Sequence, residues 1–148
     1  MAQIRTATLD DLAFLHASNM ALAWETEDKR LDAATLEKGL THLLQDPSKG
    51  FYIIVEVEGR PVGNLMITVE WSDWRNAPMW WFQSVYILPD YRGQHLFSLM
   101  YNYIRDRART EGARVLRLYV EKENVRAQKV YAAMGMAESH YLMYEENL

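Results

Sequence analysis

The sequence predicts a single α/β domain with a mixed sheet, and three observations support that class. Residues 51–71 hold two runs of β-branched and aromatic residues around a Glu-Gly turn, which is typical of an antiparallel hairpin. Residues 85–104 change from a β-run to a helical pattern, and residues 114–120 are β-rich again. Such a strand–helix–strand unit implies parallel strands with a right-handed crossover. At 148 residues and 49% hydrophobic content, the chain can bury one core, so we expect one domain over residues 1–148.

The N-terminal part predicts a short edge strand over residues 3–7, followed by a helix. Thr8 with an acidic residue, Asp11, three positions later is the capping-box pattern that starts a helix. Apolar residues then follow one face, and we expect this helix to run to about Trp24.

A polar joint over residues 25–28 separates this helix from a second one. Asp32 is placed to cap the second helix, which has to end before Pro47. Its core-facing residues recur at helical spacing and are Leu36, Leu40, Leu43 and Leu44.

The middle of the chain predicts the hairpin strands, a loop and the central strand. The hairpin strands cover residues 51–57 and 62–71, and residues 71–78 form a polar, turn-rich loop. Residues 79–88 form the central strand. The long helix after it carries Leu96, Leu99, Met100, Tyr103 and Ile104 on one face.

The C-terminal part predicts three more elements. Gly112 ends the long helix, and residues 114–120 form the parallel strand. A last helix begins near Asn124, and residues 138–145 are expected to close the sheet as a final strand.

Composition excludes several classes of function. The formal net charge of −4 argues against a broad nucleic-acid surface, which requires net basic character. No apolar run is long enough to span a membrane, and the N-terminus lacks a signal pattern. The absence of cysteine removes disulfides, thiolate metal sites and a cysteine acyl-enzyme. We therefore expect a cytoplasmic protein with no metal, no nucleic-acid partner and no membrane partner.

Two segments resemble the signatures of the GNAT N-acyltransferases. Residues 89–94, PDYRGQ, follow a strand and are similar to the start of the family's acyl-CoA-binding motif R-x-x-G-x-G/A. Residues 124–136, NVRAQKVYAAMGM, resemble the family's N-x-x-A-x-x-x-Y-x-x-x-G-F. Together with the element order, the resemblance covers nearly the whole chain. His95 and Phe97 depart from it, because they stand where the family has glycines.

The resemblance implies an acetyl-CoA site at the start of the long helix. The first amides of a helix have no partner inside it and lie at the positive end of its dipole, so they favour a diphosphate. A helical φ at His95 is open to any residue, so the amide there is expected to be kept. By position, the central strand and the last helix supply backbone and side-chain groups for pantetheine. The residues expected to bind the cosubstrate are Val85, Tyr86, Ile87, Arg92, Gly93, Gln94, His95, Leu96, Phe97, Ser98 and Asn124.

The resemblance also implies the transfer of an acetyl group to a primary amine by direct attack in a ternary complex. Tyr131 matches the family tyrosine and is expected to hydrogen-bond the leaving thiolate, although core packing is its alternative role. A lysine-like amine has a pKa of ~10.4, so its proton needs an acceptor. Glu70 is the first candidate base, Glu25 and Glu27 are the alternatives, and Glu121 ranks behind them.

Aromatic residues beside carboxylates predict the acceptor pocket. Aromatic faces with carboxylates suit a cationic amine, and the expected residues are Glu25, Glu27, Trp71, Trp74 and Trp80. A core position is the alternative for either Trp80 or Trp81. Exposed indoles are equally compatible with a homodimer interface.

Two other classes of function remain open at this point. One is a CoA-binding sensory or regulatory module that has lost catalysis through the changes at His95 and Phe97. The other is a structural partner domain that assembles through its indole surface. An amine panel, with detection of released CoA, distinguishes both from an enzyme.

Overall fold

A computed structural model describes all residues, 1–148, of the chain. Its contacts divide the chain into two compact units, Met1–Leu118 and Tyr119–Leu148, which are described separately. The expectation of one domain over residues 1–148 stays a prediction. The first unit contains β1 (Ala2–Thr6), η1 (Leu9–Asp11), α1 (Leu12–Glu27), α2 (Ala33–Gln45), β2 (Phe51–Val57), β3 (Arg60–Ser72), β4 (Ala77–Ile87), η2 (Pro89–Tyr91), α3 (Leu96–Thr110) and β5 (Val115–Arg117).

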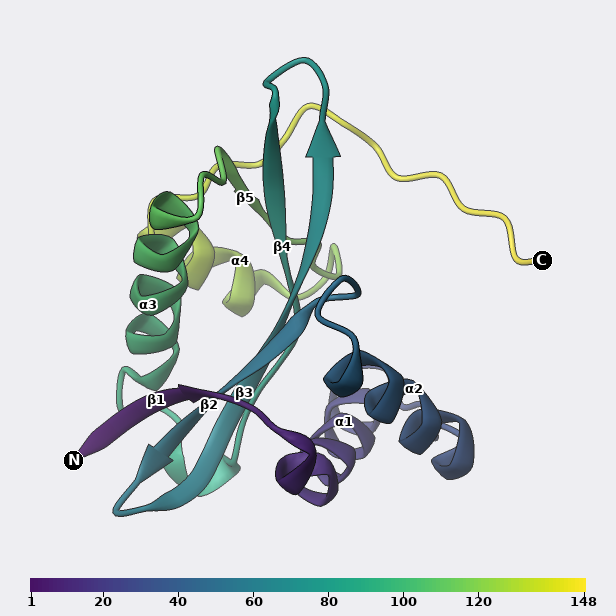
Figure 1. The fold of residues 1–148 in the computed structure, drawn as a ribbon, viewed down its shortest axis with the longest axis vertical. Helices are drawn as coiled ribbons and strands as arrows, with labels where there is room; N and C mark the ends of the chain where they lie inside the picture. Colours follow the sequence, from purple (N-terminus) through teal and green to yellow (C-terminus); the bar gives the residue numbers. More distant parts are fainter. The chain divides into compact units, whose positions relative to one another are not determined.

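The first unit is a mixed five-stranded sheet in the order β1-β2-β3-β4-β5 (Figure 1). The pairs from β1 to β4 are antiparallel, and β4 pairs with β5 in parallel through the α3 crossover. Both the mixed α/β class and the parallel unit predicted from the sequence are therefore confirmed.

Two helix starts follow from their capping residues. The Thr8 side chain accepts a hydrogen bond from the first turn while the Asp11 side chain accepts one from Thr8 N–H at 2.8 Å, which completes a capping box. Asp32 Oδ2 accepts from Thr35 N–H at 2.9 Å at the start of α2.

The end of α1 differs from the prediction. The helix continues past Trp24 to Glu27, so Glu25 and Glu27 lie in its last turn and not in a loop. It ends at Asp28, which has φ +53 and takes the left-handed conformation that closes many helices. The polar composition of residues 25–28 suggested a joint, but polar residues continue an exposed helix face as readily.

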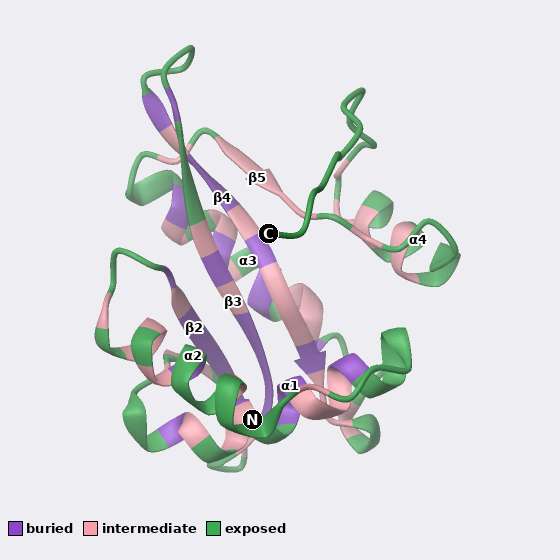
Figure 2. Ribbon diagram, turned by 90° about the vertical axis from the view of Figure 1, so that its right-hand side faces the viewer, coloured by how far each residue is buried: buried purple, intermediate pink, exposed green.

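Helices cover both faces of the sheet in this unit (Figure 1). Tyr52 and Ile54 of β2 pack with Leu15 of α1 and Leu40 of α2 on one face. On the other face, the ring of Phe82 in β4 stacks on that of Tyr101 in α3, with centroids 5.2 Å apart. Figure 2 shows that the buried residues gather in β2, β3 and β4, between these helices.

The second unit contains one helix, α4 (Val125–Ala133), which begins at the predicted cap. Asn124 Oδ1 accepts from Ala127 N–H at 3.1 Å. Residues 138–145 form no strand, contrary to our expectation of a closing strand. Their centre, residues 141–144, is an unbroken apolar run of which every side chain is at least 58% exposed. Such a run lacks the alternation of a strand with one buried face.

No helix of this chain combines the length and the apolar character that crossing a bilayer requires.

Candidate functional site

The centre of the candidate site is the part of β4 that extends beyond β5. The last parallel pair joins Trp81 to Arg117, whereas β4 continues to Ile87. Residues 82–87 therefore run beside β3 on one side, paired with it except at Ser84 and Val85, and have no β5 partner on the other. Val85, Tyr86 and Ile87, which we expected to hold pantetheine, all lie on this stretch. A strand whose second edge is not used in a sheet can accept an extended ligand as an additional strand.

A β-bulge interrupts β4 on the same stretch. Asn64 of β3 is opposite Tyr86, but Met66 is opposite Gln83, so Ser84 and Val85 together face a single β3 residue. Ser84 has φ +51, a conformation that side chains other than glycine rarely adopt. A bulge bends its strand and redirects the backbone groups next to it. The bulge therefore overlaps the stretch Val85–Ile87 that we expect to hold pantetheine, which we call the cradle.

The turn from β4 into α3 corrects the prediction made for His95. Gly93 has φ +77, and His95, the N-cap of α3, has φ +63 in place of the helical φ that we expected. Glycine takes this conformation without cost, whereas a Cβ crowds the neighbouring backbone. The structure thus explains why a glycine suits position 95, and histidine holds the same backbone shape there under strain.

The other residues of the expected phosphate site lie in this turn and in the first helical turn. Leu99 N–H donates to His95 C=O at 3.1 Å, so the amides before Leu99 precede the helical ladder. A Cβ added to Gly93 would meet no atom within 4 Å, so the glycine serves the turn and not a close contact. The Gln94 side chain donates to Asp90 C=O at 3.3 Å. In the first helical turn, Leu96 is buried, the Phe97 ring contacts the Tyr101 ring, and Ser98 is half-buried.

Three side chains from distant parts of the sequence meet beside the end of β4. Tyr86 O–H donates to Glu25 Oε2 at 2.5 Å, and Arg92 Nη2 donates to Glu25 Oε1 at 2.8 Å. The hydrogen bond from Tyr86, followed by that from Arg92, lowers the pKa of the Glu25 carboxyl below its ordinary value. Burial, and then the bond to Glu25, raises the pKa of the Tyr86 hydroxyl to about 12. At neutral pH the cluster therefore holds a carboxylate, a neutral phenol and a guanidinium.

Glu70, our first candidate for the base, belongs to a different cluster. Its Oε1 accepts from Trp81 Nε1 at 2.9 Å and lies 3.5 Å from Arg117 Nη1. Glu70 is paired with Met79 in the β3–β4 register, six residues along β4 from Val85. That spacing corresponds to roughly 20 Å of strand, which is too far for direct proton transfer at Val85. Of the predicted carboxylates, Glu25 is the one that contacts a cradle residue, and Glu27 is exposed in the last turn of α1.

The indoles expected in the acceptor pocket do not form one group. Trp71 and Trp74 lie at the far end of the β3–β4 hairpin and are 62% and 89% exposed. Trp80 is only 3% exposed and packs edge-on against Phe51, with ring centroids 5.5 Å apart. It faces the α3 side of the sheet, which is the core position left open as its alternative. The assignment of Trp80 to an acceptor pocket is therefore corrected.

The second unit carries the other two predicted residues. Asn124 fills the capping role described above, and Tyr131 lies in α4. Burial raises the pKa of the Tyr131 hydroxyl, so the phenol is neutral at physiological pH. A neutral phenol can donate one hydrogen bond.

Comparison with known proteins identifies the family. The family model described as "Acetyltransferase (GNAT) family" matches residues 9–136. The chain belongs to this family. It is 42% identical to a solved structure described as a possible acetyltransferase from Clostridium difficile 630, with a TM-score of 0.94, over 100% of this chain and 98% of that one.

Two further matches extend the comparison. A predicted acetyltransferase from Clostridium acetobutylicum, solved with acetyl-CoA, shares the GNAT fold at 14% identity and a TM-score of 0.81, over 99% and 96% of the two chains. The mycothiol acetyltransferase of Corynebacterium aurimucosum is 27% identical over 132 residues, which are 86% of this chain and 43% of that protein. The chain spans less than half the length, 42% and 43%, of the two curated relatives that it matches.

Sequence analysis did not find one buried residue next to the candidate site, Asn64. This side chain is fully buried, lies opposite Tyr86, and neither its amide nitrogen nor its amide oxygen bonds another protein group. Most buried polar side chains are hydrogen-bonded, and the exceptions concentrate at functional places. The available signal was a lone amide within the otherwise apolar run of residues 62–67.

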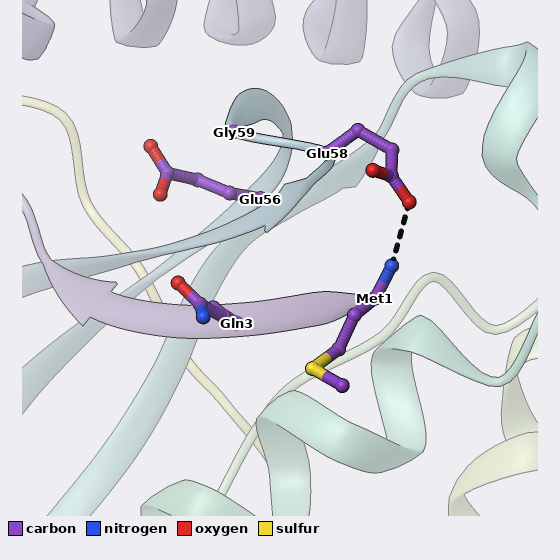
Figure 3. Close-up of a pocket in the computed structure, with 5 residues that line it drawn as sticks. All are labelled: Met1, Gln3, Glu56, Glu58 and Gly59. Atoms are coloured by element: carbon purple, nitrogen blue, oxygen red, sulfur yellow. Dashed lines mark hydrogen bonds and ion pairs between the residues drawn. The ribbon is translucent and has the colours of Figure 1, made fainter.

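A hollow elsewhere in the first unit is separate from the candidate site. It has a volume of about 290 Å³ and lies at the β2–β3 turn beside β1 (Figure 3). The amino group of Met1 donates to Glu58 Oε1 at 2.8 Å across its rim. It contains none of the predicted site residues and is lined by Met1, Gln3, Glu56, Glu58 and Gly59. No group of three or more His, Cys, Asp or Glu side chains in the chain is arranged to hold a metal ion.

Proposed function

We propose that this protein is an N-acetyltransferase that moves an acetyl group from acetyl-CoA to a primary amine of a small molecule or peptide, by direct attack in a ternary complex. The observation that carries the proposal is the extension of β4 beyond β5, with a bulge at Ser84 inside it. A strand edge that has no β5 partner fits the extended, amide-containing pantetheine arm. The turn at Gly93 and the first turn of α3 follow directly and fit its diphosphate.

When bound, acetyl-CoA supplies an activated thioester, and the residues of this chain bind and polarise it. A backbone N–H within residues 85–87 serves as a hydrogen-bond donor to the developing oxyanion, a role worth roughly 3–4 kcal/mol per donor in other acyl transfers. Tyr131 is the proposed donor to the leaving thiolate. Because its pKa is raised above that of a thiol, ~8.5, full proton transfer is uphill and a strengthening hydrogen bond is favoured.

The pKa of Glu25 makes it a poor general base. A carboxyl whose pKa is lowered by Tyr86 and Arg92 holds a proton weakly at neutral pH. We therefore propose that the amine loses its proton to solvent water. Glu25 and Glu70 each form an ion pair with an arginine. A cationic amine would therefore have to compete with an arginine for either carboxylate.

The test is an amine panel with acetyl-CoA, read out as released CoA thiol, together with calorimetry of CoA binding. We expect turnover with at least one amine class and a loss of about 100-fold in kcat for Tyr131→Phe at unchanged CoA affinity. Tyr144→Phe, which removes a hydroxyl from a side chain that is 90% exposed, is the matched control and should retain full activity. Glu70→Gln should also retain activity.

Other outcomes select the other functions. CoA binding without turnover on the whole panel would favour a regulatory binding module. Absence of CoA binding to the folded protein would overturn the proposal itself. A cytoplasmic location and a homodimer through Trp71 and Trp74 remain predictions, and sedimentation of wild type against Trp74→Ala tests the second.

A further inference from the structure

We propose that Arg92 is a positioning residue that ties the cosubstrate turn to the end of α1, and not a ligand of the diphosphate. The proposal rests on the CoA site proposed above. Every contact that carries it lies within the first unit, Met1–Leu118.

The Arg92 guanidinium is directed back toward β4 and α1. Its Nε donates to Ile87 C=O at 2.9 Å, its Nη2 donates to Glu25 Oε1 at 2.8 Å, and its central carbon lies 5.2 Å from the centroid of the Tyr86 ring. A rigid planar fork that donates to two acceptors and stacks on a ring is held in one orientation. The side chain thus joins the last residue of β4 to a residue 67 positions earlier in the sequence.

The end of α1 requires such a partner. Glu25 and Glu27 both lie in its last turn, where the helix dipole is negative, and this turn contains no basic residue. Arg92 supplies a positive charge directly to Glu25, and Tyr86 holds the second oxygen of the Glu25 carboxylate. Without the guanidinium, the Glu25 charge would remain at an unfavourable helix end.

Arg92 is also the residue directly before Gly93 and the C-cap of η2. Fixing its side chain on α1 and on Ile87 therefore fixes where the turn leaves the sheet. The last turn of α1 and the turn that leads into α3 are thereby held in a fixed position relative to each other, although they are far apart in the sequence. Loss of either partner should loosen the turn and weaken CoA binding.

Two roles for Arg92 predict opposite effects of Glu25→Gln. If Arg92 were a phosphate ligand, Glu25 would compete with the diphosphate for it, so Glu25→Gln would strengthen CoA binding. If Arg92 instead acts as a brace, that is, as the residue that ties the cosubstrate turn to α1, Glu25→Gln removes its ion-pair partner and weakens CoA binding. The sign of the change decides between the roles.

The experiment is calorimetry of CoA binding to the wild type, Glu25→Gln, Arg92→Gln and the double variant. We expect each single variant to bind CoA about 5-fold more weakly and the double variant to be no weaker than the singles. Arg92→Lys should resemble Arg92→Gln, because an ammonium cannot bridge Ile87 C=O and Glu25, although it would still attract a phosphate. Asp28→Asn removes a charge at the same helix end, at a left-handed position that asparagine tolerates, and should bind as the wild type does.

Tighter binding by Glu25→Gln, or unchanged binding by Arg92→Gln, would overturn the brace. A second measurement tests it without ligand: in urea unfolding of the free proteins, the two substitutions should be non-additive, and additive effects would also overturn it. If the folded wild type fails to bind CoA, the proposed function is wrong. The unfolding cycle then still decides the brace.

Discussion

His95 holds the cosubstrate turn in a conformation that costs free energy. A left-handed residue other than glycine costs about 1–3 kcal/mol, with histidine among the better tolerated types. Glycine at the same position would remove this cost but would add about 0.4–1 kcal/mol of chain entropy to the unfolded state. We therefore expect His95→Gly to raise the free energy of unfolding by up to about 1 kcal/mol, measured by urea denaturation.

The control for this prediction is His95→Ala. Alanine keeps a Cβ at φ +63 and therefore keeps the strain, so it should give no gain in stability. Equal stabilities of the glycine and alanine variants would show that the side chain, and not the backbone, sets the preference at this position.

At the scale of the elements, the bulge in β4 depends on the positive φ of Ser84. Valine is branched at Cβ and is strongly disfavoured at φ +51. Ser84→Val should lower the free energy of unfolding by about 1–3 kcal/mol and weaken CoA binding, because straightening β4 would redirect the backbone of the cradle. Both effects are measurable on the same preparation by urea denaturation and calorimetry.

Ser84→Gly is the matched variant for the bulge, since glycine adopts this φ freely. It should retain CoA affinity and change the free energy of unfolding by no more than about 1 kcal/mol. If valine is tolerated as well as glycine is, then the bulge is not required for the cradle.

For the whole molecule, two carboxyl groups that are paired with arginines contribute to an acid limit of stability. The bidentate contact with Arg5, with Thr8 N–H as a further donor, lowers the pKa of Asp11 below 3.8, and Tyr86 and Arg92 lower that of Glu25 below 4.5. A lowered folded-state pKa contributes stability above the unfolded-state pKa, and this contribution is lost as the pH falls through the folded-state value. Stability should therefore be level near neutral pH and decline below about pH 4.5.

The measurement is urea unfolding at several pH values between neutral and about pH 3. Asp11→Asn should be less stable than the wild type at neutral pH, by about 1–3 kcal/mol for the loss of a charged partner, and the two proteins should converge in acid. Parallel pH profiles would show that Asp11 does not contribute to the acid limit.

Much of the fold could be predicted because the signals are local. The capping box at Thr8, the cap at Asp32 and the helical spacing from Leu96 each depend on residues within a few positions of one another. The end of α1 could not be predicted, because the polar residues there suit a helix face as well as a loop. The absence of a strand at residues 138–145 could not be predicted from its place in the chain order either.

The site was less accessible to prediction because its key facts are not local. The sign of φ at His95 is not encoded by the residue type, and the ion pair of Arg92 with Glu25 spans 67 residues. The separation of Glu70 from Val85 follows only from the strand register. The family resemblance pointed to one strand and one turn, but it could not show which side chains there are hydrogen-bonded to one another.

The order of strands in the sheet has a consequence for how the chain folds. β2, β3 and β4 are neighbours both in the sequence and in the sheet, joined by a turn at residues 58–59 and another at residues 73–76. Their pairing closes only short loops, whereas β1 and β5 are reached across whole helices. Contacts of low sequence separation form soonest, so the three-stranded meander is suited to be the folding nucleus, with the outer strands added to an existing template.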